Sequence, residues 1–513
     1  MTDNGVYSIP VIVGVAQIND RNEDPAAGLD ALDLMALALE RADDDAGGNW
    51  LARTDFLGIE NQVSSGITAW PAREPITPHL LQRMALSPKS TMLTREPSGD
   101  GPVLLLNHAA NMIASGNAQV AAVVGAEALR TAAHRNTARK AEGAGRSNMM
   151  SDLLDGSVRP ILRKYGLITP ADVYPLYETA TRAAWKQSHA DAQRETGILW
   201  SGYARAAAEN DGAWIREPYA PEAITAVSPG NRMVTYPYTK LMVANSAVNQ
   251  GAALILTSLG MARESGIPED RLVFVGRGAS AHEDEDFLAR DSYAASPAMA
   301  VSIRRTMELN QLSAEDLDFV ELYNCFPCVA KMARRVLGWP LEKLPSVYGG
   351  LSFGGGPIGN CMMHAAVVMT QKLRKGGRHG LIFANGGFAT HNHTIVISSQ
   401  MTEGLFPQNF DYQDEADSQR GAIPPLDDHY VGPGQIEAYT VPYGRDGSPR
   451  YGTIVGRSPD GARFLCRVPP EDEATLSFLV SGATEPVGTE GVAVPAEDGY
   501  VVWRRAMSAG GPG

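Results

Sequence analysis

Short spacings between cysteines and between histidines are the features of this sequence most able to support metal or redox chemistry. Cys325 and Cys328 form a CxxC motif, and His391 and His393 could place two imidazoles on one face of a strand. A zinc site usually needs four ligands, and the sequence has no second cysteine pair at a matching spacing. We therefore predict no metal site. Cys325 is expected to face a site, Cys328 the core, and the histidines a pocket wall or the surface; redox or metal chemistry at either pair is the alternative.

A serine and a run of basic residues are two further candidates. Ser98 stands beside Gly99 just before a predicted helix, where its hydroxyl could act as a nucleophile if a base lay within hydrogen-bond reach. The alternative is a helix cap, a common role of serine. Arginine matches phosphate by forked hydrogen bonds, so a basic cluster could bind a phosphorylated ligand, although a solvated helix face fits equally well. The cluster consists of Arg130, Arg135, Arg139, Lys140 and Arg146.

The elements that must position these residues begin with alternating buried strands and amphipathic helices. Ile9–Val15 is a short apolar, β-branched run that ends at a glycine-flanked position and predicts a buried strand. Residues Leu29–Arg41 have apolar side chains three and four positions apart, as in an amphipathic helix. A second apolar run follows at Phe56–Ile59. This alternation predicts a layered α/β domain.

The sequence also contains an internal repeat. Asp55, Phe56 and Asn61 recur at identical spacing as Asp318, Phe319 and Asn324, and an amphipathic helix precedes each stretch. Further along, each half has a Gly/Pro turn, a His-Ala-Ala sequence on a helix, and a glycine-ended strand. The two His-Ala-Ala sequences begin at His108 and His364. Four matches in the same order indicate two copies of one α/β unit.

The chain outside the two copies divides into an insertion, a linker and a tail. The insertion is rich in alanine, arginine and aromatic residues at helical spacing, whereas the tail has short alternating segments separated by hairpin signals such as Asp446-Gly447 and Asp498-Gly499. The tail predicts a small β-barrel or sandwich. The predicted limits are 1–126 with 241–270 for the first half, 127–240 for the insertion, 271–408 for the second half, 409–430 for the linker and 431–507 for the β domain.

Composition narrows the classes of partner. The 513 residues carry a formal net charge of −14, which disfavours nucleic acid and anionic membrane surfaces as partners. Four cysteines are too few for a disulfide scaffold and suggest a reducing compartment. The first residues lack the basic flank and apolar run of a signal peptide, and no apolar stretch approaches the length of a bilayer span. We expect a cytoplasmic protein.

Taken together, the duplicated halves and their local sequences resemble the thiolase superfamily. The resemblance runs from residue 6 to about residue 400. With the extra β domain, the chain most resembles the thiolase-like proteins of type 1, and its Glu321–Phe326 segment resembles the motif of sterol-carrier-protein-type thiolases. The segments that carry the resemblance are Asn107–Gln119, Val123–Leu129, Asn249–Leu256, Glu321–Phe326, Gly349–Gly359 and Ala384–Gly387. It implies a five-layered α-β-α-β-α fold with a helical loop domain, followed by an OB-like barrel.

The departures from the family pattern fall on the catalytic positions. The nucleophilic cysteine of thiolases corresponds to Gly99, the activating histidine to Gly356 and the second cysteine to Ala384. The first residue of the motif that ends in Cys325 has become Tyr323. Losing nucleophile and base together costs about a million-fold in rate in comparable acyl-transfer sites. Ordinary thiolase chemistry is therefore not expected.

What the resemblance leaves in place is a binding site for CoA or an acyl-CoA, without a further cofactor. Ser246 matches a serine that touches the pantetheine arm in thiolases, and the basic cluster begins where the nucleotide binds in the family. Oxyanion donors are expected near Gly355 and Gly386. Position 357 is counted among the glycines of its loop, and no donor is expected there. Asn324 could hold a polarising water. The catalytic candidates of the altered motif are Tyr323, Asn324 and Cys325.

Three functions follow from the resemblance. The first is a CoA or acyl-CoA binding protein of lipid metabolism without ordinary thiolase activity. The second is an acyl-CoA lyase or aldolase that uses Tyr323, because cysteine-free relatives of thiolases include aldolases that work with tyrosines and a small OB-fold partner. The alternative for Tyr323 is a buried tyrosine whose hydroxyl is bonded to a neighbour. The third is a residual acetyl-CoA C-acyltransferase. Both a monomer and a homodimer fit the sequence.

Overall fold

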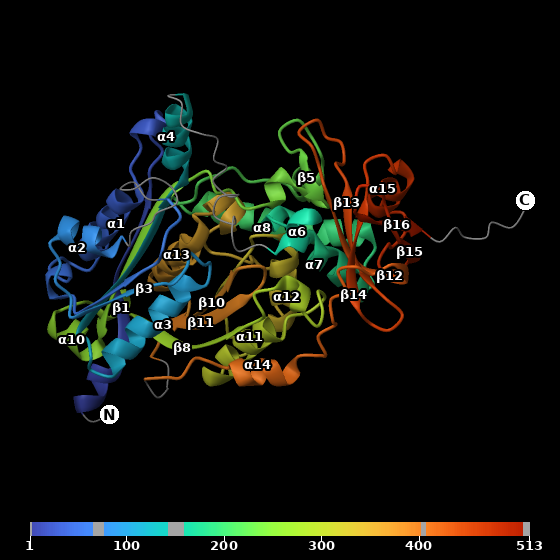
Figure 1. Ribbon diagram of the computed structural model, residues 1–513. Coiled ribbons are helices and arrows are strands. Elements are labelled where there is room, and N and C mark those ends of the chain that lie inside the picture. The colour runs from blue at the N-terminus through green and yellow to red at the C-terminus, as the bar shows by residue number, and fades with distance from the viewer. Residues whose placement is uncertain (1–2, 65–75, 142–158, 402–406, 506–513) are drawn as a thin grey trace, which may run out of the picture.

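Two α/β halves of one design form the body of the molecule, as the computed structural model shows (Figure 1). The structure describes residues 3–64, 76–141, 159–401 and 407–505. The first half consists of β1 (Pro10–Asn19), α1 (Ala31–Asp45), β2 (Phe56–Ile59), α2 (Thr77–Met84), β3 (Ser90–Leu93), α3 (Gly101–Ala114), β4 (Val120–Ala128), β7 (Asn249–Ser258) and α10 (Leu259–Glu264). The second consists of β8 (Val273–His282), α11 (Pro297–Leu309), β9 (Phe319–Leu322), α12 (Pro327–Leu337), α13 (Cys361–Lys375), β10 (His379–Gly386) and β11 (His391–Ser398).

The strand order confirms the duplication predicted from the sequence. The sheet runs β3-β2-β4-β7-β1-β8-β11-β10-β9, so β2, β4, β7 and β1 correspond to β9, β10, β11 and β8. In each half the first of these pairs is parallel and the other pairs are antiparallel. The halves join where Val11 and Ile12 of β1 pair with Phe274 and Val273 of β8.

Five layers result from the way the helices cover these strands. Helices α3 and α13 contact strands of both halves and form the central layer. Helix α1 covers the outer face of the first half, and α11 and α12 cover that of the second. Both faces of the strands are therefore buried, which explains why β4 and β7 are buried at every position.

The insertion of the first half is mostly helical. It contains α4 (Leu129–Ala141), α6 (Pro160–Lys164), α7 (Pro170–Ala184), α8 (His189–Glu209), α9 (Pro221–Thr225), β5 (Met233–Tyr236) and β6 (Tyr238–Thr239). Its helix α4 contacts the first half, whereas α7 and α8 lie against the second half. A buried ion pair fixes α7 to α12: Lys331 Nζ lies 2.5 Å from Glu178 Oε1, and the two side chains are 1% and 3% exposed. The Tyr238 hydroxyl donates to the other oxygen of Glu178.

The C-terminal region forms the closed five-stranded barrel that the sequence predicted as OB-like. Its elements are β12 (Gly432–Pro442), β13 (Gly452–Arg457), β14 (Arg463–Val468), α15 (Glu473–Val480), β15 (Glu490–Pro495) and β16 (Val501–Arg505). The pairing order β12-β13-β14-β16-β15 returns to β12, which closes the barrel. Helix α15 and strand β15 were not predicted from the sequence. The segment predicted as a linker contains the short helix α14 (Gln413–Gln419).

The barrel is attached to the body through the insertion and through a loop of the second half. Helix α7 packs along β12, and β5 pairs with the end of β12. The fully buried Arg463 of β14 pairs with Glu437 and donates to the carbonyl oxygens of Leu288 and Arg290. The barrel therefore contacts α7 and the loop that contains Arg290. These two segments also hold the turn between β10 and β11, which belongs to the candidate site.

Two buried histidines make the fold sensitive to acid. Burial lowers the pKa of His364 and of His393 from 6.5 to about 3. Between pH 6.5 and 3 the unfolded chain therefore binds more protons than the folded one, so stability is full above this window and falls as the pH falls through it. We expect a loss of about 2 kcal/mol per histidine at pH 5. Thermal unfolding at pH 8 and pH 5 should show a smaller difference for His393→Gln than for wild type. If wild type and His393→Gln lost the same stability between pH 8 and pH 5, the lowered pKa of His393 would be contradicted. His429→Gln, at an exposed position, is the control.

Candidate functional site

The candidate site lies where equivalent ends of the two halves meet. Strand β2 runs into Glu60 and strand β9 runs into Tyr323, and these are the same position of the repeat. The N-termini of α3 and α13 approach them, and β10 ends beside them at Gly386. Segments far apart in the sequence thus converge on the tip of α3, where thiolases carry their nucleophile.

Tyr323 occupies the space next to Gly99. A β-carbon added to Gly99 would lie 2.5 Å from Tyr323 Cε2 and 2.6 Å from the Tyr323 hydroxyl oxygen, and it would collide with the Asn385 carbonyl. Tyr323 is 7% exposed, and burial raises its pKa well above the ordinary value of 10. The residue at the tip is therefore a neutral phenol, which can donate a proton.

The positions of the two other lost residues differ in their surroundings. A β-carbon on Gly356 would meet its nearest atom, the Asn245 carbonyl oxygen, at 3.2 Å. The space of the missing histidine is therefore less filled than that at Gly99. Ala384, at the position of the second cysteine, is fully buried on β10.

The loop before α13 offers less to an oxyanion than the sequence suggested. The Gly356 N–H donates to the Asn245 carbonyl at 2.9 Å, and the Gly355 N–H donates to another carbonyl of the loop at 3.2 Å, so both are engaged. Grouping position 357 with the glycines of this loop was wrong, because the residue there is Pro357. Proline has no backbone N–H, so position 357 cannot supply a hydrogen-bond donor. Of the two predicted oxyanion donors, Gly386 is the one that lies beside the α3 tip.

The difference between positions 99 and 356 gives a matched pair of variants. Gly99→Ala is expected to lower the free energy of unfolding by about 1–3 kcal/mol, because the new methyl group collides with Tyr323 and with a backbone carbonyl. Gly356→Ala should lie close to wild type, because its neighbours need to move only by a few tenths of an ångström. Chemical denaturation of both variants measures the effect. Equal stabilities would show that Tyr323 does not fill the space at Gly99.

Asn324 has an amide group available for a ligand. Its side chain is fully buried, and Oδ1 accepts from the Leu351 N–H at 2.8 Å. Nδ2 has no hydrogen-bond partner in the part of the chain that the structure describes. The close approach requires a glycine at position 350, whose φ is +61°. Burying an unpaired amide is costly, so Nδ2 is suited to hold a water or a ligand oxygen.

The cysteines near the site are thiols in apolar surroundings. Cys325 and Cys328 are buried and free, and burial raises the pKa of Cys325 to about 12. Cys361, the first residue of α13, is buried too, and its pKa is raised well above 9. Thiolates are the reactive form, so these residues are poor nucleophiles. Within the described ranges, no group of three potential ligands could hold a metal ion.

A cluster of polar side chains lies on the outer side of the α3 tip. Ser98 and Asp100 are half-buried; the Ser98 hydroxyl donates to Asp100 Oδ1, and both side chains lie against Gly386. His391, on the next strand, pairs with Glu285 at 3.0 Å and is 37% exposed. That pairing raises the pKa of His391, with further contributions from the charges of Asp100 and Glu96. His393, two residues along, is instead buried against Asn107 at 2.6 Å.

Glu60 is a site residue that analysis of the sequence missed. It is 1% exposed and accepts from the Ser98 N–H and the Thr94 hydroxyl, each at 3.0 Å. Burial raises its pKa well above 4.5, and the charge of Asp100 adds to this. The sequence does contain a signal for it, because Glu60 holds the same position in the repeat as Tyr323.

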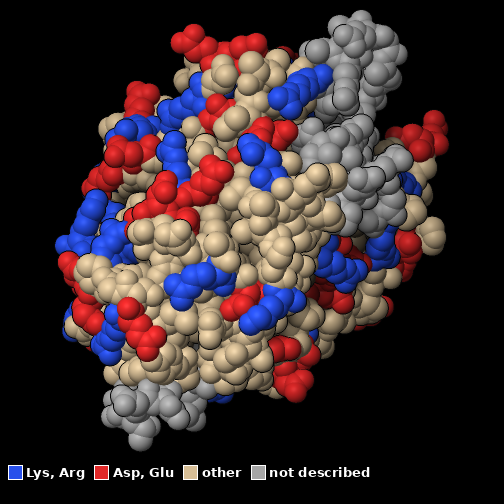
Figure 2. Space-filling model, turned by 90° about the vertical axis from the view of Figure 1, so that its left-hand side faces the viewer, with Lys and Arg blue, Asp and Glu red and all other residues tan. Residues whose placement is uncertain are grey.

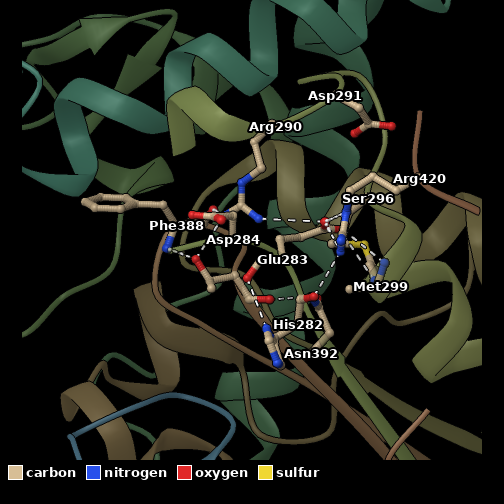
Figure 3. A network of polar contacts seen from close by, with 12 residues as sticks. His282, Glu283, Asp284, Arg290, Asp291, Ser296, Met299, Phe388, Asn392 and Arg420 are labelled. Atoms are coloured by element: carbon tan, nitrogen blue, oxygen red, sulfur yellow. Dashed lines mark hydrogen bonds and ion pairs between the residues drawn. The ribbon is translucent and has the colours of Figure 1, made fainter. Parts of the chain in front are cut away.

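The turn between β10 and β11 is held from three sides. The Tyr174 hydroxyl of α7 donates to the Gly387 carbonyl at 2.8 Å, and the Tyr177 hydroxyl to that of Phe388 at 2.9 Å. Arg290 donates to Phe388 and Thr390. Figure 3 shows Arg290 next to the buried Glu283, which also accepts from Ser296 and pairs with Arg420. This network keeps Gly386 and His391 in place.

The residues predicted to bind CoA are dispersed. Ser246 is half-buried and follows Asn245, which accepts the Gly356 N–H. Arg130 donates to the Asn22 carbonyl, and Arg135 to those of Ala26 and Gly28. The side chains of Arg139 and Lys140 and the whole of Arg146 lie outside the described residues. On the face that carries α1, α2 and α10, acidic and basic side chains are interspersed (Figure 2).

Comparison with known proteins identifies chains of the same fold. The family of the "thiolase-like protein type 1 additional C-terminal domain" matches residues 413–498. A monomeric SCP2-thiolase like protein type 1 from Mycobacterium smegmatis shares 27% identity over 98% of this chain and 99% of its own, with a TM-score of 0.79. No curated protein matches.

Two further solved structures share the fold over 77% of this chain. The Ltp2-ChsH2(DUF35) aldolase is 16% identical, with 98% of that chain covered and a TM-score of 0.56. Human mitochondrial 3-ketoacyl-CoA thiolase in complex with CoA is 15% identical, with 99% covered and a TM-score of 0.57. No helix among the described residues is long and apolar enough to cross a membrane. The chain therefore has the fold of the thiolase-like superfamily, and its C-terminal region matches the additional C-terminal domain of thiolase-like protein type 1.

Proposed function

We propose that this protein binds CoA and acyl-CoA thioesters at the tip of α3 and has no ordinary thiolase activity. One observation carries the proposal. Position 99 is a glycine, and the Tyr323 phenol fills the space in which the side chain of a reactive cysteine would lie. A thiolase needs a thiolate and a base, whereas the buried thiols here are neutral and position 356 is a glycine. Asn324 Nδ2 remains as an unpaired donor for a thioester oxygen.

The ligand class rests on the fold and on the position of Ser246. One structure of the same fold contains CoA, and Ser246 stands beside the loop that holds Gly356. We place the protein in the cytoplasm and in lipid metabolism, as a monomer like the related Mycobacterium smegmatis protein. The basic residues of α4 are proposed to contact the nucleotide end of CoA.

A second candidate is an acyl-CoA lyase that cleaves a β-hydroxyacyl-CoA in a retro-aldol reaction. A neutral tyrosine at the α3 tip favours it, because such a phenol can protonate the enolate carbon that carbon–carbon cleavage leaves on the thioester. One structure of the same fold is an aldolase. A residual acyltransferase is less favoured, because it needs a nucleophile with a suitable base.

Calorimetry and an activity assay test the main proposal together. We expect CoA, acetyl-CoA and acetoacetyl-CoA to bind, and Ser246→Phe to weaken binding by narrowing the pantetheine path. Thiolysis of acetoacetyl-CoA should be about a million-fold slower than in an intact thiolase. Absence of binding heat with every thioester would remove the proposal, and thiolysis at ordinary rates would contradict the assignment of Tyr323.

A further inference from the structure

Six side chains where the insertion meets the barrel form an alternating row of cations and aromatic rings, here called the cation–aromatic ladder. Each cation lies 4.4 to 5.7 Å from the centre of the ring or rings next to it. Two members come from the end of α6, and the other four lie on or beside β13, β14 and β16. In order along the row they are Arg450, Tyr451, Arg467, Tyr500, Lys164 and Tyr165.

Hydrogen bonds between the insertion and the barrel hold the rings of the ladder in place. The Thr453 hydroxyl donates to the Tyr165 carbonyl at 2.7 Å, and the Tyr165 hydroxyl accepts from the Val501 N–H at 3.1 Å. The Tyr451 hydroxyl packs over Gly166, where φ is +71° and an added β-carbon would lie 2.2 Å from the hydroxyl oxygen. The rings therefore have fixed positions on which the cations stack.

The three cations of the ladder have no anionic partner. Arg450, Arg467 and Lys164 form no hydrogen bond or ion pair with another residue that the structure describes. Arg467 is nevertheless only partly exposed, whereas charged groups removed from water are normally paired. Its contacts with Tyr451 and Tyr500, at 4.4 and 4.6 Å, use the faces of the rings and none of the five N–H donors of the guanidinium.

Two carboxylates act by charge on rings of the ladder, and backbone groups already engage both. Asp172, which acts on Tyr451, accepts from the Thr169 N–H at 2.8 Å and caps the start of α7. Asp498, which acts on Tyr165, accepts from the N–H two residues along at 3.2 Å. Neither forms an ion pair with a cation of the ladder. The positive charge of the ladder therefore stays available, in a chain whose net charge is −14.

From this arrangement we propose that the cation–aromatic ladder binds a diphosphate group, at a site separate from that of CoA. The fork of Arg467 holds one phosphate by paired hydrogen bonds, and a neighbouring cation holds the other. Lys164 is placed for this role, because it shares the Tyr500 ring with Arg467, at 5.7 and 4.6 Å from its centre, and is exposed. Three adjacent cations suit a ligand with two or more negative charges, and the proposal does not depend on the proposed function.

The position of the ladder separates it from the CoA path proposed above. Figure 1 shows α6 beside the barrel and away from α4, whose basic residues are assigned to the nucleotide end of CoA. Arg450, Tyr451 and Arg467 lie within residues 413–498, the region that matches the additional C-terminal domain. The diphosphate site is therefore built largely by the barrel and is a property of the chain that carries it.

Calorimetry in a phosphate-free buffer, with inorganic pyrophosphate and ADP as probes, tests the proposal. We expect both probes to bind wild type, and Arg467→Gln to weaken binding by about 10- to 100-fold through the loss of charge-assisted hydrogen bonds. Arg467→Lys keeps the charge but not the fork and should weaken binding less. Arg445→Gln, at an exposed arginine between β12 and β13 of the same barrel, is the matched control and should bind like wild type.

Thermal unfolding of the same variants separates binding from a purely structural role. If the ladder only joins the insertion to the barrel, Arg467→Gln should lower the melting temperature and leave the affinity for pyrophosphate unchanged, which would overturn the proposal. Absence of binding of both probes to wild type would overturn it as well. Tighter binding of ADP than of pyrophosphate would identify a nucleotide as the source of the diphosphate, and equal affinities would identify a diphosphate alone.

A titration with CoA distinguishes this site from the proposed function. We expect saturating pyrophosphate to leave the affinity of wild type for CoA unchanged, and Arg467→Gln to bind CoA like wild type. If pyrophosphate displaced CoA and Arg467→Gln weakened both ligands equally, the ladder would be part of the CoA site and the separate site would be overturned. Binding of pyrophosphate without binding of CoA would remove the proposed function and leave the diphosphate site standing.

Discussion

Replacing Tyr323 by phenylalanine is expected to slow cleavage of a β-hydroxyacyl-CoA, and α-proton exchange of acetyl-CoA, by about 10²–10⁴-fold. The substitution removes a hydroxyl that lies against Gly99 and keeps the ring that fills the space of the lost cysteine. Burial raises the pKa of Tyr323, so the phenol stays protonated until a strongly basic group such as an enolate carbon lies next to it. Product formation from the thioester, followed by chromatography, measures the effect.

A matched variant separates this effect from general loss of a tyrosine hydroxyl. Tyr430→Phe removes a hydroxyl that donates to Pro433 near the start of the barrel, and it should leave the rate unchanged. The affinity of Tyr323→Phe for CoA should stay within about threefold of wild type, because the ring still closes the tip. An unchanged cleavage rate in Tyr323→Phe would exclude the phenol as the acid.

The largest expected effect on stability is that of Lys331→Met. This substitution leaves Glu178 buried without its cation, which typically costs about 3–5 kcal/mol. Glu178 is bonded to the Tyr238 hydroxyl on its other oxygen, so it cannot turn toward water. Because the pair fixes α7 to α12, we also expect the β10–β11 turn, which Tyr174 and Tyr177 of α7 hold, to loosen. Chemical denaturation measures the loss.

An exposed pair offers the control for this prediction. Lys372 lies 3.1 Å from Glu209, with side chains that are 28% and 58% exposed, and Lys372→Met should cost less than about 1 kcal/mol. The double variant Lys331→Met with Glu178→Gln should be more stable than the sum of the single effects implies, because it leaves no unpaired charge. A cost for Lys331→Met no greater than for Lys372→Met would contradict the burial of this pair.

The sequence predicted the fold well because the fold depends on patterns along short stretches. The repeat of Asp55–Asn61 at Asp318–Asn324 marked β2 and β9, and the structure shows them as equivalent strands. Hairpin signals located most of the barrel. Helix α15 and strand β15 were missed because Glu473–Val480 and Glu490–Pro495 are short and lack strong periodicity.

The site was predicted less completely, because its properties depend on contacts between distant segments. The sequence showed that a cysteine was missing near Gly99, but not that Tyr323 fills the space there. The burial of Glu60 at the α3 tip and the pairing of His391 with Glu285 likewise arise only when the halves pack together. Arg130 and Arg135 appeared as a basic cluster, whereas in the folded chain both donate to backbone carbonyls. Side-chain partners of this kind have no short-range signal.

A crystal structure of the protein with bound acetyl-CoA would test the central claim most directly. If the duplicated scaffold still holds a pantetheine thioester, the chain of the ligand should pass Ser246, and its carbonyl oxygen should lie within hydrogen-bond distance of Asn324 Nδ2 or the Gly386 N–H, next to the Tyr323 hydroxyl. A ligand bound elsewhere, or a path to the α3 tip that side chains close even at saturating acetyl-CoA, would contradict it.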